Sequence, residues 1–284
     1  MPTPIDFGTV LITGACSGVG REVARQLAHR VRTLVLVASE VRQLEALREA
    51  LEGDYPTLGV LLLPCDLSQP DQVDGVLEEL ARHLIHVDVL VNAVAAGQRG
   101  PYAEQRWADI DRMLQTNVVV PLMLTHRLLG PMLARGRGGI LHLGSGVGRL
   151  FLPGFVTPAA THRFLDGFLE SLRLEVEGSG VVITQAVVGP LEEAESSPEP
   201  QPFFQISAAR CVREAVAGFD HGAQLVYPGW GHRWAMTLLP LLPRPVRRAL
   251  GRWAARGPGV PAGAAQPELP ASAGALLRGA PVRT

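Results

Sequence analysis

Short apolar runs alternate along the chain with segments whose apolar residues recur at helical spacing. The runs are rich in Val, Leu and Ile and are bounded by Gly, Pro or polar residues, which is typical of buried strands. The expected strands are residues 9–14, 33–39, 59–67, 87–95, 138–146 and 180–190. The expected helices are residues 19–30, 40–52, 72–84, 107–135 and 158–177, with Pro121 and Pro131 bending or interrupting the fourth.

This alternation predicts a parallel sheet covered by helices on both faces. We therefore expect an α/β fold, a doubly wound parallel sheet forming a single domain over residues 5–256. Ligands of such sheets bind at the carboxyl ends of the strands. The polar, proline-rich residues 192–204 predict a mobile loop above that pocket. Residues 257–284 have no periodicity and predict a disordered tail.

The segment 225–256 mixes Trp, Leu and Arg and has two interpretations. It either closes the substrate pocket or lies on a membrane surface or a partner. Prolines at positions 240, 243 and 245 argue against one long amphipathic helix, so pocket closure is the simpler interpretation and membrane contact is not expected.

Composition limits the function classes. The 284 residues are 47% hydrophobic, enough for one sizeable core, and the net charge of −1 gives no support for nucleic-acid binding. The cysteines are Cys16, Cys65 and Cys211, an odd number without metal-ligand spacing. We therefore expect a reduced, cytoplasmic protein without a metal site. The amino terminus lacks the pattern of a signal peptide, and no uninterrupted apolar stretch of about 18 residues predicts a membrane span.

A glycine-rich turn, TGACSGVG at residues 13–20, joins the first strand to its helix. Gly14, Gly18 and Gly20 allow the backbone to approach a ligand closely. The helix start at Val19–Gly20 offers unpaired N–H groups and the positive end of a helix dipole. This placement predicts a site for the pyrophosphate of a dinucleotide.

The pattern Thr-Gly, three residues, Gly-x-Gly resembles that of the short-chain dehydrogenases/reductases, a family with a Rossmann-type fold. Further motifs of that family follow in order over residues 5–195, and they are CDL (65–67), DVLVNA (88–93), QTNVVVP (115–121), ILHLGSGVGRLFLPG (140–154), ESLRLEV (170–176) and VVGP (187–190). The resemblance implies NAD(P) as cofactor. The residues it implies as cofactor contacts are Thr13, Gly14, Ser17, Gly18, Val19, Gly20, Ser39, Asp66, Leu67, Asn92 and Gly189.

The resemblance leaves open whether the cofactor is NAD or NADP. Ser39 stands where many NADP-binding relatives have Arg, and Glu40 follows it, but Arg42 and Arg21 are close by. We therefore favour NADP over NAD. The resemblance also implies a pocket for an apolar small molecule, lined by FLPGF at residues 151–155. It further implies a homodimer or homotetramer paired through helices 107–135 and 158–177, or a hetero-oligomer with a related subunit.

The sequence departs from the family pattern at the positions of the catalytic Tyr and Lys. Relatives have a proton-transferring Tyr thirteen residues after the serine matched by Ser145, and a Lys four residues further on. Here those positions are Pro158 and His162, and the chain contains no lysine at all. Thr157 is expected to cap the helix with Pro158 at its first position. The ordinary proton relay is therefore predicted to be absent.

The remaining candidates for catalysis are Ser145, Asn117 and His162. Ser145 either polarises a substrate carbonyl or is a remnant, and Asn117 either acts in catalysis or bonds backbone of the next strand. His162 is either partly exposed helix surface or a general acid with a pKa of ~6.5. Tyr102, from a loop at the pocket border, is a further phenol. We thus expect a regulatory, scaffolding or non-redox protein, with an atypical oxidoreductase or an inactive dimer partner as alternatives.

Overall fold

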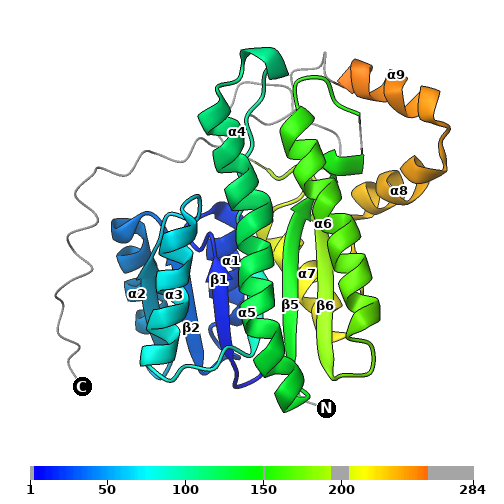
Figure 1. Cartoon of the computed structure of the whole chain (residues 1–284). Helices are drawn as coiled ribbons and strands as arrows, with labels where there is room; N and C mark the ends of the chain where they lie inside the picture. The colour runs from blue at the N-terminus through cyan, green and yellow to red at the C-terminus, as the bar shows by residue number, and fades with distance from the viewer. Residues whose placement is uncertain (1–2, 150, 193–204, 255–284) are drawn as a thin grey trace.

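The structure is a computed structural model, and it describes residues 3–149, 151–192 and 205–254. Its centre is a seven-stranded parallel sheet with the strand order β3-β2-β1-β4-β5-β6-β7 (Figure 1). The strands are β1 (Thr9–Thr13), β2 (Thr33–Ala38), β3 (Gly59–Pro64), β4 (Val89–Asn92), β5 (Gly138–Ser145), β6 (Val181–Val188) and β7 (Leu225–Val226). The helices are α1 (Gly18–Leu27), α2 (Val41–Asp54), α3 (Pro70–Arg82), α4 (Trp107–Leu114), α5 (Val120–Arg135), α6 (Val156–Glu175), α7 (Ala208–Asp220), α8 (Trp230–Leu238) and α9 (Arg244–Ala254).

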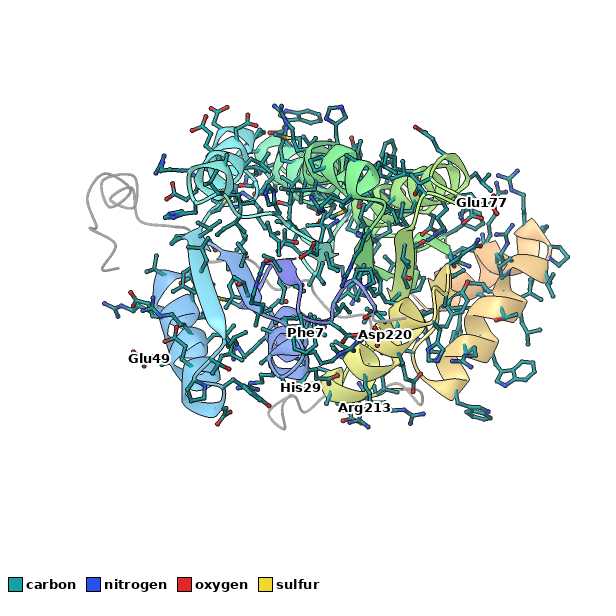
Figure 2. All side chains as sticks on the ribbon, turned by 90° about the horizontal axis from the view of Figure 1, so that it is seen from below. Phe7, His29, Glu49, Glu177, Arg213 and Asp220 are labelled. Atoms are coloured by element: carbon teal, nitrogen blue, oxygen red, sulfur yellow. The ribbon has the colours of Figure 1, made fainter. Side chains whose placement is uncertain are left out.

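Helices cover both faces of the sheet, as seen from below in Figure 2. One core lies between the sheet and the helices α1, α2 and α7. The other lies beneath α3, α5 and α6. The strands are apolar on both sides because both faces are buried, which explains their continuous apolar runs. The predicted doubly wound α/β fold in a single domain is therefore confirmed.

The strand order reverses beside β1, since β2 lies on one side of it and β4 on the other. The Thr13 hydroxyl donates a hydrogen bond to the Val91 carbonyl at 3.4 Å and accepts one from the Ala93 N–H at 3.3 Å. These bonds hold the ends of β1 and β4 together. In open parallel sheets this reversal opens a crevice at the carboxyl ends, where ligands bind.

Several sequence predictions need correction. The sheet has a seventh strand, β7, which has only two residues and therefore no sequence periodicity to reveal it. Residues 107–135 form α4 and α5 joined by a turn of π-helix at Gln115–Val119. This stretch is long and apolar enough to cross a membrane by length and composition, and its α5 part packs against β4 and β5 of the sheet. The expected loop 192–204 and tail 257–284 lie outside the described residues, except for Glu192.

Candidate functional site

The glycine-rich turn forms a backbone cradle at the start of α1. Gly14 has a left-handed backbone, with φ of +65°, and a Cβ on Gly20 would overlap the carbonyl oxygen of Gly14. Gly18 differs, because a Cβ there would meet no atom within 4 Å. The Ser17 hydroxyl caps the helix by accepting a hydrogen bond from the Gly20 N–H at 2.9 Å. Open space at Gly18 beside the unpaired N–H groups of the first turn, to which Val19 belongs, fits a pyrophosphate.

The ends of β2 and β3 form the side of the crevice where the sequence resemblance predicts the adenosine of the cofactor. Asp66 is held by its own turn, because its Oδ1 atom accepts hydrogen bonds from the Ser68 N–H at 2.9 Å and the Ser68 hydroxyl at 2.8 Å. The neighbouring Leu67 is buried. Ser39 is half-buried at the end of β2. Asp66 and Ser39 thus lie at the edge where the sequence predicts adenosine to bind.

Arg21 extends from α1 toward the same edge. Its guanidinium donates hydrogen bonds to the Cys16 carbonyl and to Oε1 of Gln43, both at 3.2 Å. Glu40 lies close, since its carbonyl oxygen is 3.9 Å from the Cys16 sulfur. A positive charge held at the end of β2 suits a phosphate on the adenosine ribose.

Asn117 lies in the π-helical turn and is buried. Its Oδ1 accepts a hydrogen bond from the Ala96 N–H, and its Nδ2 donates one to the Ala96 carbonyl, both at 2.7 Å. Nδ2 also donates to the Thr161 hydroxyl at 3.1 Å. The predicted backbone partner in the next strand was wrong, because Ala96 belongs to the loop after the preceding strand β4. Asn117 therefore joins that loop to α6.

Ser145 ends β5, and its Oγ atom accepts a long hydrogen bond of 3.4 Å from the Val147 N–H. Pro158 is buried in the first turn of α6, with its ring facing Gly97 in the loop after β4. The predicted cap was wrong: α6 begins at Val156 after Phe155, so Thr157 and Pro158 lie inside the first turn. Proline is tolerated there because the N–H groups of a first turn have no helical partner.

His162 follows Pro158 by one turn and is buried, which corrects its interpretation as partly exposed. Gly148 packs against it, because a Cβ on Gly148 would lie 3.1 Å from the Cβ of His162. Burial lowers the pKa of His162, and the nearby Asp166 carboxylate offsets only part of that effect. His162 is therefore neutral at physiological pH, which weakens its hypothetical role as a general acid.

A row of buried polar side chains crosses the sheet beneath this region, and the sequence did not reveal it. Asn92, His142 and Gln185 are register neighbours on β4, β5 and β6. Gln185 donates a hydrogen bond to Asp166 of α6 at 2.6 Å. Burial, with smaller electrostatic contributions from His162 and Arg173, lowers the pKa of His142 to about 3. The only hint in the sequence was the lone histidine of an otherwise apolar strand.

α8 covers the carboxyl ends of β5 and β6. His232 forms a 3.0 Å hydrogen bond with the Val187 carbonyl, and a Cβ on Gly189 would lie 2.8 Å from its ring. Met236 packs against Gly146 just after Ser145. Gly189 therefore makes room for α8, and the prediction that it also contacts the cofactor stays a prediction. No pattern in the sequence pointed to His232 or Met236.

The site thus places a glycine-rich backbone cradle at one side of the crevice and Ser145, Asn117, Pro158 and His162 at the other. Pro158 carries no ionisable group, and the imidazole of His162 is neutral at physiological pH. Tyr102 lies in a short 3-10 helix, Tyr102–Glu104, and is half exposed. Among the four described residues Ser145, Asn117, Pro158 and His162, only Ser145 carries a hydroxyl.

Comparison with known proteins supports this assignment of the fold. A family model described as short chain dehydrogenase matches residues 8–199. Among relatives, the fatty acyl-CoA reductase Rv0547c of Mycobacterium tuberculosis is 33% identical over 50% of this chain and 48% of its own. Dehydrogenase/reductase SDR family member 7B of Bos taurus is 33% identical over 62% of this chain and 55% of its own. The chain thus spans about half the length of these two relatives.

Solved structures agree. A short-chain dehydrogenase from Sphingobium yanoikuyae in complex with NADPH is 26% identical, with a TM-score of 0.72 over 86% of this chain and 94% of that one. The bulky-bulky ketone specific alcohol dehydrogenase from Comamonas testosteroni is 25% identical, with a TM-score of 0.71 over 84% and 96%. This chain therefore belongs to the short-chain dehydrogenase/reductase family and has its NAD(P)-binding oxidoreductase fold.

Proposed function

We propose that the protein binds NAD(P), with NADP preferred, and that it does not perform the ordinary proton relay of its family. The observation that carries this proposal is the first turn of α6, where the buried Pro158 and the buried, neutral His162 occupy the relay positions. NAD(P), when bound, supplies hydride chemistry. The chain's own residues supply a cradle at Gly18 and a cation, Arg21, beside β2. Such a protein serves as a nucleotide-dependent regulator or scaffold, or uses its pocket for non-redox chemistry.

The test is calorimetric titration of the full chain with NADPH and NADH, followed by a turnover assay on apolar ketones, aldehydes and alcohols. We expect micromolar binding of NADPH, weaker binding of NADH and turnover at least about 100-fold below that of tyrosine-bearing relatives. Absence of binding at millimolar cofactor would overturn the first half of the proposal. Turnover at the rates of those relatives would overturn the second half.

A second candidate function is an atypical oxidoreductase centred on Ser145. It is favoured because the only hydrogen bond seen at the Ser145 hydroxyl among the described residues is the long one accepted from the Val147 N–H, which leaves the hydroxyl proton for a substrate carbonyl. Positioning alone contributes much of a hydride-transfer rate. Under this alternative, Ser145→Ala lowers any measured turnover by at least about tenfold. Unchanged turnover in that variant contradicts it.

We also infer a cytoplasmic protein that forms homo-oligomers or pairs with a related subunit. The three cysteines are free, which supports a reducing compartment. Leu133 on α5 and Phe164 and Leu174 on α6 are exposed, which supports pairing through these helices. Light scattering coupled to gel filtration tests this inference, and a monomer at micromolar concentration contradicts it.

A further inference from the structure

The carboxyl-terminal helices project apolar side chains into solvent. α8 and α9 lie next to each other beyond the β7 end of the sheet (Figure 1). Seven large apolar residues that they and the turn between them carry are exposed, and these are Trp230, Trp234, Leu238, Leu241, Val246, Leu250 and Trp253. Exposed apolar side chains gathered in one segment mark an interaction surface.

The exposed residues on α8 follow its helical repeat. Trp230, Trp234 and Leu238 are spaced four residues apart and share one face. His232 and Met236 are buried and anchor the opposite face to the sheet. Packing on the sheet thus leaves the outward face of α8 in solvent, and Trp230 on that face is 71% exposed.

α9 is divided in the same way. Val246, Leu250 and Trp253 form an apolar stripe, and Trp253 is 76% exposed. Arg244, Arg248 and Arg252 form a parallel stripe of cations, all exposed. A third side faces the protein: the Arg247 guanidinium lies 5.4 Å from the centre of the Phe151 ring, and a Cβ on Gly251 would overlap the Phe151 backbone. The packing of α9 on the protein therefore buries neither exposed stripe.

The charge of this surface has a single sign. Residues 221–254 contain no Asp or Glu, but they contain Arg233, Arg244, Arg247, Arg248 and Arg252. Within the described part of the chain, Arg244, Arg248 and Arg252 form no ion pair. As far as the described residues go, this surface is therefore both apolar and positively charged.

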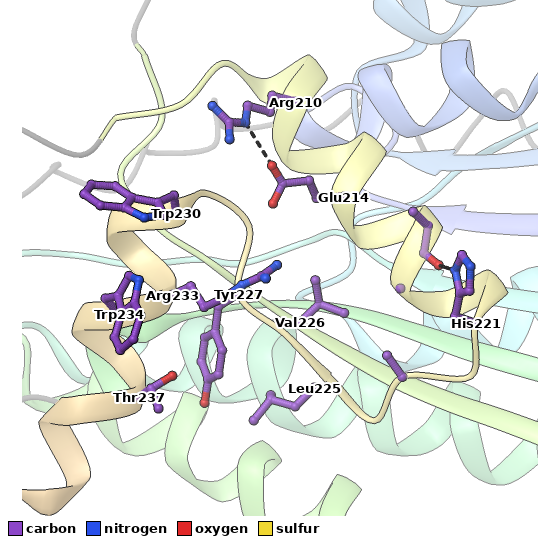
Figure 3. A pocket seen from close by; sticks show the side chains of 13 residues that line it. Arg210, Glu214, His221, Leu225, Val226, Tyr227, Trp230, Arg233, Trp234 and Thr237 are labelled. Atoms are coloured by element: carbon purple, nitrogen blue, oxygen red, sulfur yellow. Dashed lines mark hydrogen bonds and ion pairs between the residues drawn. The ribbon is translucent and has the colours of Figure 1, made fainter.

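The side of α8 that faces α7 is open as well. A cavity of about 940 Å³ lies between α7, β7 and α8, and Trp230, Trp234 and Tyr227 are among its lining residues (Figure 3). Arg233, from the same helix, also lines it. Aromatic rings with an adjacent cation at a hollow suit a group that is apolar at one end and anionic at the other.

We propose that α8 and α9 form a docking surface for an anionic phospholipid bilayer. Trp and Leu insert at the boundary between headgroups and acyl chains, while arginines bind the headgroup phosphates. A second copy of the chain fits less well, because it would bring together two surfaces that carry the same positive charge. A protein partner would also accept Trp and Arg, which protein interfaces favour, but an anionic bilayer better matches a positive charge that extends over the whole segment.

This proposal replaces the expectation that membrane contact is absent. That expectation rested on prolines that interrupt the segment. The structure shows that the interruption produces two short helices, each with its own exposed apolar face, instead of removing amphipathicity. Because α9 packs on Phe151, six residues after Ser145, docking would also bring the predicted substrate pocket near the lipid.

The chain carries its own reporter for a test. Of its four tryptophans, Trp230, Trp234 and Trp253 lie on the proposed surface, and Trp107 lies on α4. In a Trp107→Phe background, tryptophan emission reports on the surface alone. The full chain is mixed with vesicles of phosphatidylcholine, with or without 30% phosphatidylglycerol, in low salt, and binding is followed by co-sedimentation and emission. We expect binding and a blue shift with phosphatidylglycerol only, and weaker binding in 0.5 M salt.

Matched variants decide between specific docking and general charge. The triple variant R244Q/R248Q/R252Q is expected to weaken binding about 100-fold. The control R25Q/R82Q/R112Q removes the same charge from exposed positions elsewhere and should change binding less than threefold. Circular dichroism and urea unfolding check that both variants fold.

Three outcomes would overturn the proposal. The first is no co-sedimentation at millimolar lipid in low salt. The second is equal loss of binding in both triple variants. The third is self-association of the unaltered chain that the first triple variant abolishes, because that result assigns the surface to a second copy. None of these outcomes depends on cofactor binding or turnover.

Discussion

Asn117 donates a hydrogen bond from Nδ2 to the Thr161 hydroxyl at 3.1 Å, and the same hydroxyl donates one to the Pro158 carbonyl at 2.9 Å. Asn117 also holds both backbone groups of Ala96. One buried amide therefore connects the loop after β4 to the first turns of α6. These contacts give Asn117 a structural role that does not depend on catalysis.

Asn117→Ala is expected to lower the free energy of unfolding by about 3 kcal/mol, because it leaves the Ala96 N–H and carbonyl without partners. Urea unfolding followed by circular dichroism measures the loss. Thr161→Val leaves both Ala96 bonds in place and removes the two bonds of the Thr161 hydroxyl, and it should cost less, about 1–2 kcal/mol. A loss below about 0.5 kcal/mol in the alanine variant would show that this amide does not hold the loop.

Substitutions at two glycines of the cradle can distinguish an effect on cofactor binding from an effect on folding. Gly18→Ala adds a methyl group to open space, so the fold should remain as stable or gain up to about 1 kcal/mol while NADPH binding weakens at least about tenfold. Gly20→Ala overlaps the Gly14 carbonyl and should destabilise the fold by about 2 kcal/mol or more. Calorimetric titration and urea unfolding of both variants measure these effects. Unchanged NADPH affinity in the first variant would place the nucleotide elsewhere.

Arg21 is expected to set the preference for NADPH. Arg21→Gln removes a cation that is held beside the end of β2, and should weaken NADPH binding about tenfold while changing NADH binding less than twofold. Titration with both cofactors measures the ratio. Equal effects on the two cofactors would mean that Arg21 does not meet the ribose phosphate.

Restoring the relay should restore turnover. The double variant P158Y/H162K places a phenol and an ammonium one turn apart on α6. We expect NADPH-dependent reduction of apolar ketones at least about 100-fold above the unaltered chain. The control P158F/H162K has the same bulk without the hydroxyl and should stay at the original level. Equal gains in both variants would exclude proton transfer by the phenol as the cause.

The buried His142 predicts a defined acid sensitivity. Its pKa is lowered to about 3 in the folded state, chiefly by burial, whereas the unfolded chain takes up the proton near pH ~6.5. The folded state is therefore fully favoured above pH ~6.5, and the advantage is lost as pH falls from there toward 3, by ~1.4 kcal/mol per pH unit.

His142→Leu should remove that part of the acid sensitivity. At pH 5 the variant is expected to gain about 2 kcal/mol over the unaltered chain relative to their difference at pH 7.5. Urea unfolding at the two pH values measures the gain. The exposed His29, replaced in the same way, serves as control (Figure 2). Parallel pH profiles for His142→Leu and the unaltered chain would contradict the assignment.

The sequence by itself determined the fold and the identity of the groups at the relay positions. Apolar runs and helical spacing reveal layers because a strand buried on both faces must be apolar throughout. The glycine pattern located the cradle because only glycine permits the close approach seen between Gly14 and Gly20. The absence of lysine and the presence of Pro158 and His162 are read directly from the sequence and required no coordinates.

Only the tertiary structure decided the environments of these groups. Residues far apart in sequence, such as His142, His162 and Asp166, meet in one buried cluster, and their protonation depends on that meeting. The same holds for α8, whose His232 packs on Gly189 while Trp230 and Trp234 remain outside. A pattern shows that a helix has two faces, but only packing decides which face is buried. For that reason the surface of α8 and α9 was visible only in three dimensions.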